Sequence, residues 1–82
     1  MSKVSVRFFA RYAELAGCSW SAVNLETPAT VADVISRVRE VFPGTQAMPP
    51  RPLAALNQRH VKLDAIVNDG DEVALLPPFS GG

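Results

Sequence analysis

The sequence predicts an α+β fold in which one main helix packs on one face of a small mixed β-sheet. An alternating apolar segment opens the chain, a single helical stripe of apolar residues occupies its middle, and a second alternating segment closes it. The resulting order of strand, strand, helix and then two or more strands is typical of a helix layer on a sheet layer. The long connection also allows the first and last strands to lie side by side and parallel.

The first predicted strand covers residues 4–9. Val4, Val6 and Phe8 share one face of this strand, and the residues between them share the other. Residues 19–26 alternate in the same way and predict a second strand that returns as a hairpin. The alternation in this second strand fits burial of either face.

A short helix or turn is predicted between these two strands. Residues 11–16 are rich in helix formers and stop at Gly17, which can adopt a positive φ. Cys18 follows this turn, and we expect it to be a small, partly buried residue.

The main helix is predicted to begin after Pro28. Thr30 and Asp33 have the spacing of an N-cap residue and its reciprocal partner. One apolar stripe at helical spacing follows, made of Val31, Val34, Ile35, Val38, Val41 and Phe42. Pro43 and Gly44 end the helix. About 13 residues at 1.5 Å each span about 20 Å, which matches a six-residue strand, so this helix can cover one sheet face.

The second half of the chain predicts shorter elements. The proline-rich residues 43–52 look like a linker. Residues 53–57 and 60–63 are strand-like, although the break between them is not fixed by the pattern. Residues 68–71 read Asn-Asp-Gly-Asp, a tight-turn signal, and residues 72–76 form the last predicted strand before two prolines.

Length and charge restrict the function classes. The chain has 82 residues, with 8 Lys+Arg and 8 Asp+Glu, so that its formal net charge is zero. We therefore expect one domain over residues 1–78 with a C-terminal tail over residues 79–82, and no binding to nucleic acid or to a membrane. A chain this small leaves little interior for a complete enzyme active site.

Two single residues bear on metal chemistry and location. His60 is the only histidine and Cys18 the only cysteine, so neither a zinc site nor a supported Cys-His pair is expected. A lone cysteine cannot form an internal disulfide, which favours a reducing, cytoplasmic location. The sequence contains no glycine-rich nucleotide loop, so we expect no bound cofactor, and any ATP must be bound by a partner.

The C-terminal residues combine a stiff stem with a slender tip. Pro77 and Pro78 fix φ at the exit from the last strand, whereas Gly81 and Gly82 have no Cβ and can pass where a side chain would collide. Residues 79–82 reach at most about 14 Å at 3.3–3.6 Å per residue. The tail could therefore bring its α-carboxylate into a pocket of another protein.

Several stretches together resemble the small sulfur-carrier subunits of molybdopterin synthase. They are residues 6–10, 13–17, 56–58, 68–74 and 77–82. The resemblance covers nearly the whole chain in order and length, with residues 43–52 the least similar part, and implies a β-grasp, ubiquitin-like fold with four to five strands. Phe79 stands where the family often has a smaller aliphatic residue, which implies a wider channel mouth in the partner.

The resemblance implies a chemistry for Gly82. An adenylating enzyme of the ubiquitin-activating type would use ATP to activate the Gly82 carboxylate, and sulfur would convert it to a thiocarboxylate. Pro77, Pro78, Phe79, Ser80 and Gly81 would insert with it into the large synthase subunit. Sulfur would then pass to a pterin precursor and build the molybdopterin dithiolene within a heterotetramer. The acid-base groups would belong to the large subunit.

Other functions remain open at this point. The same fold with an activated Gly-Gly end could serve as a ubiquitin-like protein modifier or as a sulfur carrier for another pathway such as thiazole synthesis. A third possibility is an interaction domain whose terminal glycines are incidental.

Strand parity predicts a docking patch made of Phe9, His60, Leu76 and Phe79. If Val4, Val6 and Phe8 pack under the helix, then Phe9 faces outward, and Leu76 faces away from Val73 and Leu75. Clustered apolar side chains near the surface mark interaction sites. The charges expected at the rim of the patch are Arg7, Arg11 and Lys62.

Overall fold

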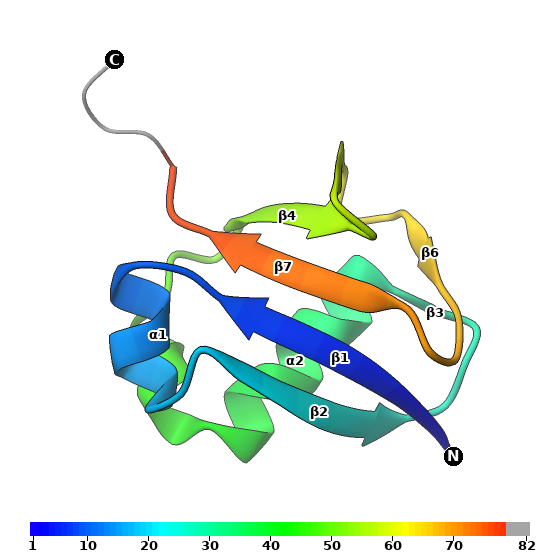
Figure 1. Cartoon of the computed structure of the whole chain (residues 1–82), viewed down its shortest axis with the longest axis horizontal. Helices are drawn as coiled ribbons and strands as arrows, with labels where there is room; N and C mark the ends of the chain where they lie inside the picture. Colours follow the sequence, from blue (N-terminus) through cyan, green and yellow to red (C-terminus); the bar gives the residue numbers. More distant parts are fainter. Residues whose placement is uncertain (79–82) are drawn as a thin grey trace.

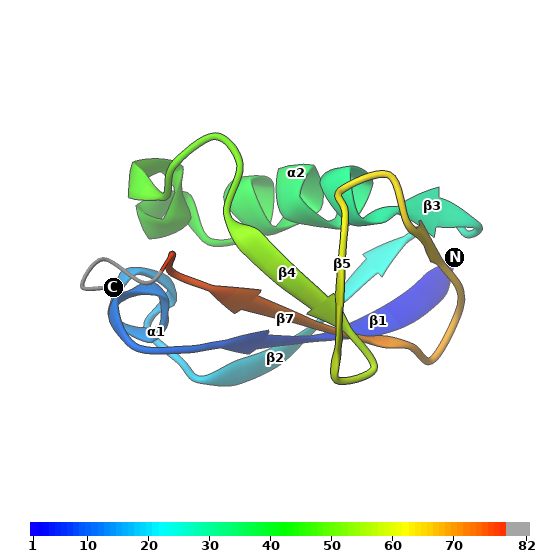
Figure 2. The same cartoon turned by 90° about the horizontal axis from the view of Figure 1, so that it is seen from above.

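The computed structural model describes residues 1–78 as one helix layer on one sheet layer (Figure 1). The five-stranded sheet has the order β2-β1-β7-β4-β5. Its strands are β1 (Ser2–Phe8), β2 (Trp20–Leu25), β4 (Leu53–Leu56), β5 (Arg59–Val61) and β7 (Glu72–Leu76). The main helix, α2 (Val31–Val41), lies over one face of this sheet (Figure 2). The α+β prediction is confirmed.

The first and last strands lie side by side at the centre of the sheet. β1 and β7 pair in parallel, with Val6 opposite Val73 and Phe8 opposite Leu75. Val73 and Leu75 are both fully buried. The parallel pairing that the long connection allowed is therefore present. β7 is hydrogen-bonded on both sides, because β4 pairs with its other edge.

β1 and β2 form the predicted antiparallel hairpin. Val4 pairs with Val23, and the face of β2 that carries Val23 and Leu25 is the buried one. The short helix α1 (Arg11–Ala16) occupies the connection, and Gly17 ends it with a φ of 81°. The expected short helix is confirmed. The packing of β2 also shows which of its two faces is buried, which the alternation of its residues did not reveal.

The capping box of α2 forms as the sequence predicts. The Thr30 side chain accepts a hydrogen bond from the Asp33 backbone N–H at 3.1 Å, and the Asp33 carboxylate accepts one from the Thr30 N–H at 3.0 Å. β3 (Ala29–Thr30) leads into the helix and pairs with β6 (Ile66–Val67). This small second sheet was not predicted, because two-residue strands are too short to show alternation.

The prediction was wrong for one member of the apolar stripe, Val41. Val31, Val34, Ile35 and Val38 are buried, but Val41 is 43% exposed. The next residue, Phe42, instead closes the stripe, because its ring packs edge-on against Phe8 at a centroid distance of 5.5 Å. Val41 therefore ends α2 on the solvent side.

The segment expected to be a linker is packed structure. Residues 43–47 form a 3₁₀ helix, η1 (Pro43–Ala47), and both Thr45 and Met48 are buried. Arg39 holds this segment against α2, since its guanidinium donates to the backbone carbonyls of Thr45, Met48 and Pro49 at 2.7 to 3.3 Å. Contacts that depend on one arginine side chain leave no periodic pattern in the sequence. The proline-rich composition of residues 43–52 therefore wrongly indicated a linker.

The remaining turns fix the late strands. β4 and β5 are joined at Asn57 and Gln58, both with positive φ, which places the break that the sequence left open. β5 ends at Val61 rather than at residue 63, because the Lys62 carbonyl accepts a turn hydrogen bond from Ala65. The predicted turn at residues 68–71 is confirmed, with Gly70 at a φ of 86°.

Candidate docking surface and carrier tail

The candidate tail begins at the end of the central strand. β7 ends at Leu76, Pro77 is half-buried and Pro78 is exposed. Because β7 is paired on both edges, the position from which the tail departs is fixed by two neighbouring strands. Phe79, Ser80, Gly81 and Gly82 lie outside the described residues.

The outer face of the sheet, opposite α2, carries two members of the predicted docking patch at one end. Leu76 is half-buried, in contrast to the fully buried Leu75 before it. Phe9 is 38% exposed, and its N–H donates to the Leu75 carbonyl at 3.4 Å. Phe9 therefore lies beside the end of β7, next to the start of the tail.

Leu53 belongs to the same end of the outer face and was missed by the sequence argument. It lies directly opposite Leu76 in the β4–β7 register and is 39% exposed. The strand-like pattern around Leu53 was visible, but the pattern does not reveal which strand pairs with it. The apolar end of the outer face is thus formed by Phe9, Leu76 and Leu53.

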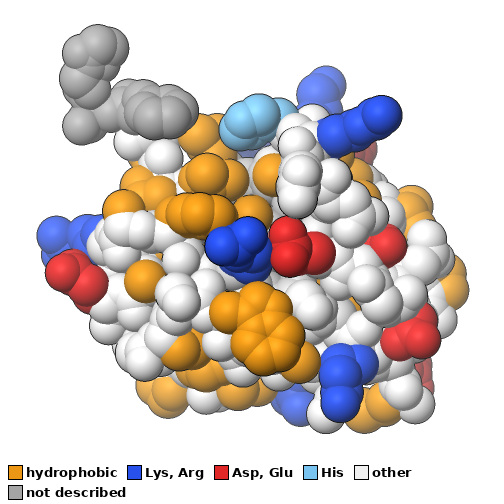
Figure 3. All heavy atoms as spheres, in the orientation of Figure 1, with side chains coloured by type: hydrophobic (Ala, Val, Ile, Leu, Met, Phe, Trp, Pro, Cys, Tyr) orange, Lys and Arg blue, Asp and Glu red, His pale blue; other side chains and the backbone are white. Residues whose placement is uncertain are grey.

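His60 also lies on the outer face, on the strand next to that of Leu53. It is exposed on β5 and pairs with Ala55, which in turn pairs with Ala74. Val61 next to it is half-buried and packs against the core, as expected. Figure 3 looks onto this face and shows hydrophobic side chains gathered over it, with the histidine near their margin.

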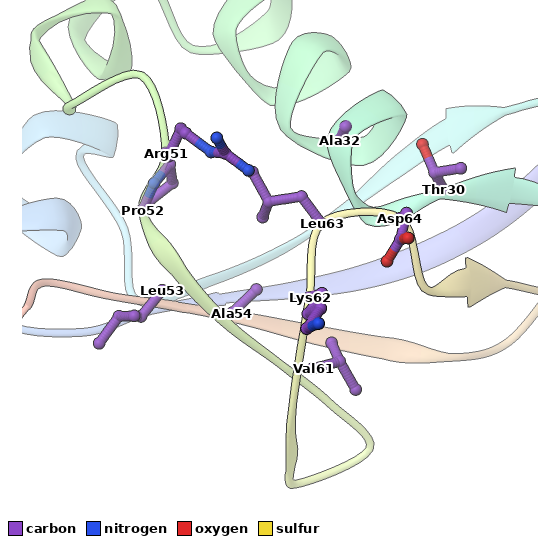
Figure 4. Close-up of a pocket in the computed structure, with 10 residues that line it drawn as sticks. All are labelled: Thr30, Ala32, Arg51, Pro52, Leu53, Ala54, Val61, Lys62, Leu63 and Asp64. Atoms are coloured by element: carbon purple, nitrogen blue, oxygen red, sulfur yellow. The ribbon is translucent and has the colours of Figure 1, made fainter.

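The predicted rim charges lie in different places. Arg7 is on the outer face, with its guanidinium 5.3 Å from the centroid of the Phe9 ring. Arg11 is exposed at the start of α1. Lys62, by contrast, helps to line a groove between the N-terminal end of α2 and the β4–β5 hairpin (Figure 4), together with Thr30 and Leu63.

Few charged groups within residues 1–78 interact with one another. Their one ion pair joins Arg37 to Glu40 at 3.8 Å on the surface of α2. Burial raises the pKa of Tyr12 above its ordinary value of 10.0, and the positive charge of Arg39 opposes that rise. No cluster of His, Cys, Asp and Glu in this part of the chain could hold a metal ion, and none of its helices could span a membrane.

Cys18 is half-buried, as expected from its place after the α1 turn. It packs against the edge of the hydrophobic core.

The topology defines a class. A mixed sheet with parallel first and last strands at its centre and one face covered by a helix is the ubiquitin-like β-grasp fold. The sequence confirms a particular branch of that class. The chain belongs to the ThiS family, whose model matches residues 6–82.

Relatives and solved structures agree with this assignment. The molybdopterin synthase sulfur carrier subunit of Chlamydomonas reinhardtii is 32% identical, over 98% of this chain and 99% of that one. Small archaeal modifier protein 1 from Haloferax volcanii has a crystal structure with a TM-score of 0.86, 27% identity and coverage of 99% and 100%. A complex of subunits 1 and 2 of molybdopterin-converting factor from Helicobacter pylori contains a chain with the same fold, at a TM-score of 0.60, 24% identity and coverage of 98% and 99%.

Proposed function

We propose that this chain is the sulfur-carrier subunit of a molybdopterin synthase and that the Gly82 carboxylate is the group that carries sulfur. The observation that carries the proposal is the extent of the family match, which runs from residue 6 through the terminal Gly81-Gly82 pair. The similarity to the C. reinhardtii subunit also covers nearly the full length of both chains. The terminal glycines are therefore part of the family pattern.

The fold supports a carrier role because it holds the start of the tail in place. Leu76 is paired with Leu53 on one side, and the Leu75 carbonyl accepts from Phe9 on the other. Pro77 and Pro78 then restrict φ at the two following positions. A partner that binds the outer face thus meets the tail at a defined place.

The chemistry follows from the inertness of a carboxylate. Its negative charge repels nucleophiles, so the Gly82 carboxylate oxygen must first attack the α-phosphate of ATP, which gives an acyl-adenylate and releases pyrophosphate. Sulfur at the oxidation level of hydrosulfide then displaces AMP and loses its proton, which leaves a thiocarboxylate. This sulfur is largely ionised at neutral pH and, like a thiolate, is a soft nucleophile. Attack of this sulfur on a carbon of the pterin precursor forms a carbon–sulfur bond and displaces an oxygen leaving group from that carbon. Water then cleaves the resulting thioester, which returns the Gly82 carboxylate and leaves the sulfur on the pterin.

Two protein partners are needed for these steps. ATP is used by an adenylating enzyme of the ubiquitin-activating type, and the acid-base groups and pterin contacts belong to the large synthase subunit. The large subunit docks on the apolar end formed by Phe9, Leu76 and Leu53, takes up residues 77–82, and completes a heterotetramer. His60 lies at the margin of that interface. We expect these encounters to take place in the cytoplasm and to involve neither nucleic acid nor membrane.

Mass spectrometry of the intact chain tests the proposal. Incubation with the adenylating enzyme, ATP and a sulfide source should replace one oxygen of the chain by one sulfur, located at Gly82 by fragmentation. A variant that lacks Gly82 should stay unmodified. A variant extended by one residue, and verified to be untrimmed, should also fail to support molybdopterin synthesis; full activity of that extended chain would contradict the proposal.

A second candidate function is covalent protein modification. The similarity to small archaeal modifier protein 1 favours it, because the likeness covers both chains almost completely. In that case the activated Gly82 carbonyl would be attacked by a lysine amine, and AMP would leave. Chain isolated from cells would then carry isopeptide-linked proteins, whereas a pure sulfur carrier would show the thiocarboxylate alone. Service in another sulfur pathway such as thiazole synthesis would give the same thiocarboxylate but a different acceptor.

A further inference from the structure

The outer face of the sheet carries one continuous cross-strand row. Arg7 on β1 lies directly opposite Trp20 on β2 and, on its other side, opposite Ala74 on β7. Ala74 lies opposite Ala55, and Ala55 opposite His60. Directly opposed residues point to the same face of a sheet. We call this set the outer row: Trp20, Arg7, Ala74, Ala55 and His60.

Arg7 has aromatic neighbours, and Glu72 lies on the same face, diagonally across from Arg7 on β7. Its guanidinium lies 5.3 Å from the centroid of the Phe9 ring, and its cross-strand neighbour is Trp20. Among the residues that the structure describes, it takes part in neither an ion pair nor a side-chain hydrogen bond. An arginine laid on an aromatic ring presents its planar fork of N–H donors at a restricted angle, which suits a carboxylate.

Trp20 gives a second reason to regard this part of the surface as an interface. It is the chain's only tryptophan, and it is 56% exposed on an edge strand. Tryptophan and arginine are the residue types most enriched among those that dominate binding energy at interfaces. The helix α2 lies on the opposite face of the sheet (Figure 2).

We infer that Arg7, flanked by Phe9 and Trp20, is the anchor for an acidic side chain of the large synthase subunit, and that the docking surface extends from the tail across β1 to the β2 edge. The inference rests on the proposed function. Charge complementarity identifies the partner group, because a guanidinium that forms no ion pair with any residue of 1–78 can still bind a carboxylate of the partner. The position of Arg7 identifies the partner. Phe9 contacts both Arg7 and the end of β7, where the tail begins, so Arg7 adjoins the surface on which the large subunit is proposed to dock.

A lasting contact with the large subunit needs a larger surface than the apolar end alone. A stable complex buries about 800 Å² on each side, with about 20–30 residues. The apolar end contributes only Phe9, Leu76 and Leu53, so a lasting subunit contact needs more of the sheet. The outer row extends this surface across β7, to β2 on one side and to β5 on the other.

Titration calorimetry with the large synthase subunit of the same organism tests the anchor. Arg7→Ala should raise the Kd at least about tenfold and flatten its dependence on salt. Arg7→Lys should retain the salt dependence but recover only part of the affinity, since an ammonium lacks the planar fork. Arg51→Ala is the matched control, because it removes an exposed cation in the groove on the α2 side of the sheet, away from the outer row, and its Kd should stay at the wild-type value.

Trp20 supplies an independent readout. When the carrier alone contains 5-fluorotryptophan, its single fluorine resonance reports whether this side chain enters the interface, and we expect a shift on addition of the large subunit. An unmoved resonance, or an Arg7→Ala variant that binds as tightly as Arg51→Ala, would overturn the inference. A loss confined to binding of the adenylating enzyme would also overturn it, since the anchor would then serve the other partner.

The proposed function and the Arg7 anchor can fail separately. If the wild-type chain binds the large subunit and both Arg7 variants bind equally well, the proposed function stands and the anchor is wrong. If the wild-type chain does not bind the large subunit at all, both are wrong. Thermal melting of each variant excludes unfolding as the cause, because exposed positions such as Arg7 change stability little.

Discussion

Gly44 passes so close to the backbone of Leu15 that a β-carbon at position 44 would overlap the Leu15 carbonyl oxygen. This contact joins η1 to α1, two elements far apart in the chain. The group that would be hit is backbone within a helix, which cannot move aside as a flexible side chain could. Glycine is required here by space.

Gly44→Ala should therefore destabilise the domain by about 2 to 3 kcal/mol, the cost of overpacking a site that cannot relax. Urea unfolding followed by circular dichroism measures this change. Gly17→Ala is the matched control, because position 17 has open space but a φ of 81°, and it should cost only about 1 kcal/mol from backbone conformation. An unchanged midpoint for Gly44→Ala would show that α1 and η1 can separate freely.

Ala10 occupies a backbone conformation that suits glycine. Its φ is 52° and its ψ is −127°, and the Tyr12 N–H donates to the Phe9 carbonyl at 3.0 Å, which makes Ala10 the second residue of a type II′ turn. Ala10→Gly should raise stability by about 1 kcal/mol, since strain at such a position costs about 1–3 kcal/mol and glycine loses some of that gain to chain entropy. Ala13→Gly, inside α1, should lower stability by about 1 kcal/mol. A loss of stability in both variants would argue against strain at Ala10.

Tyr12 buries a hydroxyl that has no hydrogen-bond partner among the described residues. Removal of this group by Tyr12→Phe should leave stability at neutral pH unchanged or higher by up to about 1 kcal/mol, because an unsatisfied buried polar group is itself a cost. Denaturant midpoints of the two proteins at pH 7 give the comparison, and a clear loss in the Phe variant would reveal a partner for the hydroxyl.

The same pair of proteins should diverge at alkaline pH. Burial raises the pKa of Tyr12 above 10.0 in the folded state, against the opposing charge of Arg39. The unfolded chain then releases the phenolic proton at a lower pH than the folded chain does. Stability from this group is complete below pH 10.0 and is lost as the pH rises from there through the folded pKa. Wild-type stability should thus fall more steeply above pH 10.0 than that of Tyr12→Phe, and parallel curves would contradict the raised pKa.

Leu76→Glu should weaken binding of the large synthase subunit at least about tenfold while the fold is retained, because the charge enters the apolar end of the outer face. Ile66→Glu is a suitable control, since Ile66 is 55% exposed on the small second sheet and outside the docking surface. Far-ultraviolet circular dichroism checks the fold of both variants. Equal affinities for the two glutamate variants would remove Leu76 from the interface.

The sequence by itself determined the local elements and the chemistry of the tail. Alternation identified the buried face of β1, and the Thr30–Asp33 pair located the start of α2, because both signals depend on neighbours a few residues apart. The Gly81-Gly82 end, with its two prolines, is equally a local pattern. These features were readable without any knowledge of long-range contacts.

Only the tertiary structure decided which strands are neighbours and therefore which surface residues meet. Leu53 opposes Leu76, and Trp20 opposes Arg7, through pairings whose register depends on the packing of the whole sheet. Arg39 holds residues 45–49 in the same non-local way, which made a supposed linker part of the core layer. Periodicity states which residues of one strand share a face, but it does not state what lies beside that face. The docking surface is for this reason a property of the fold, whereas the tail is a property of the chain.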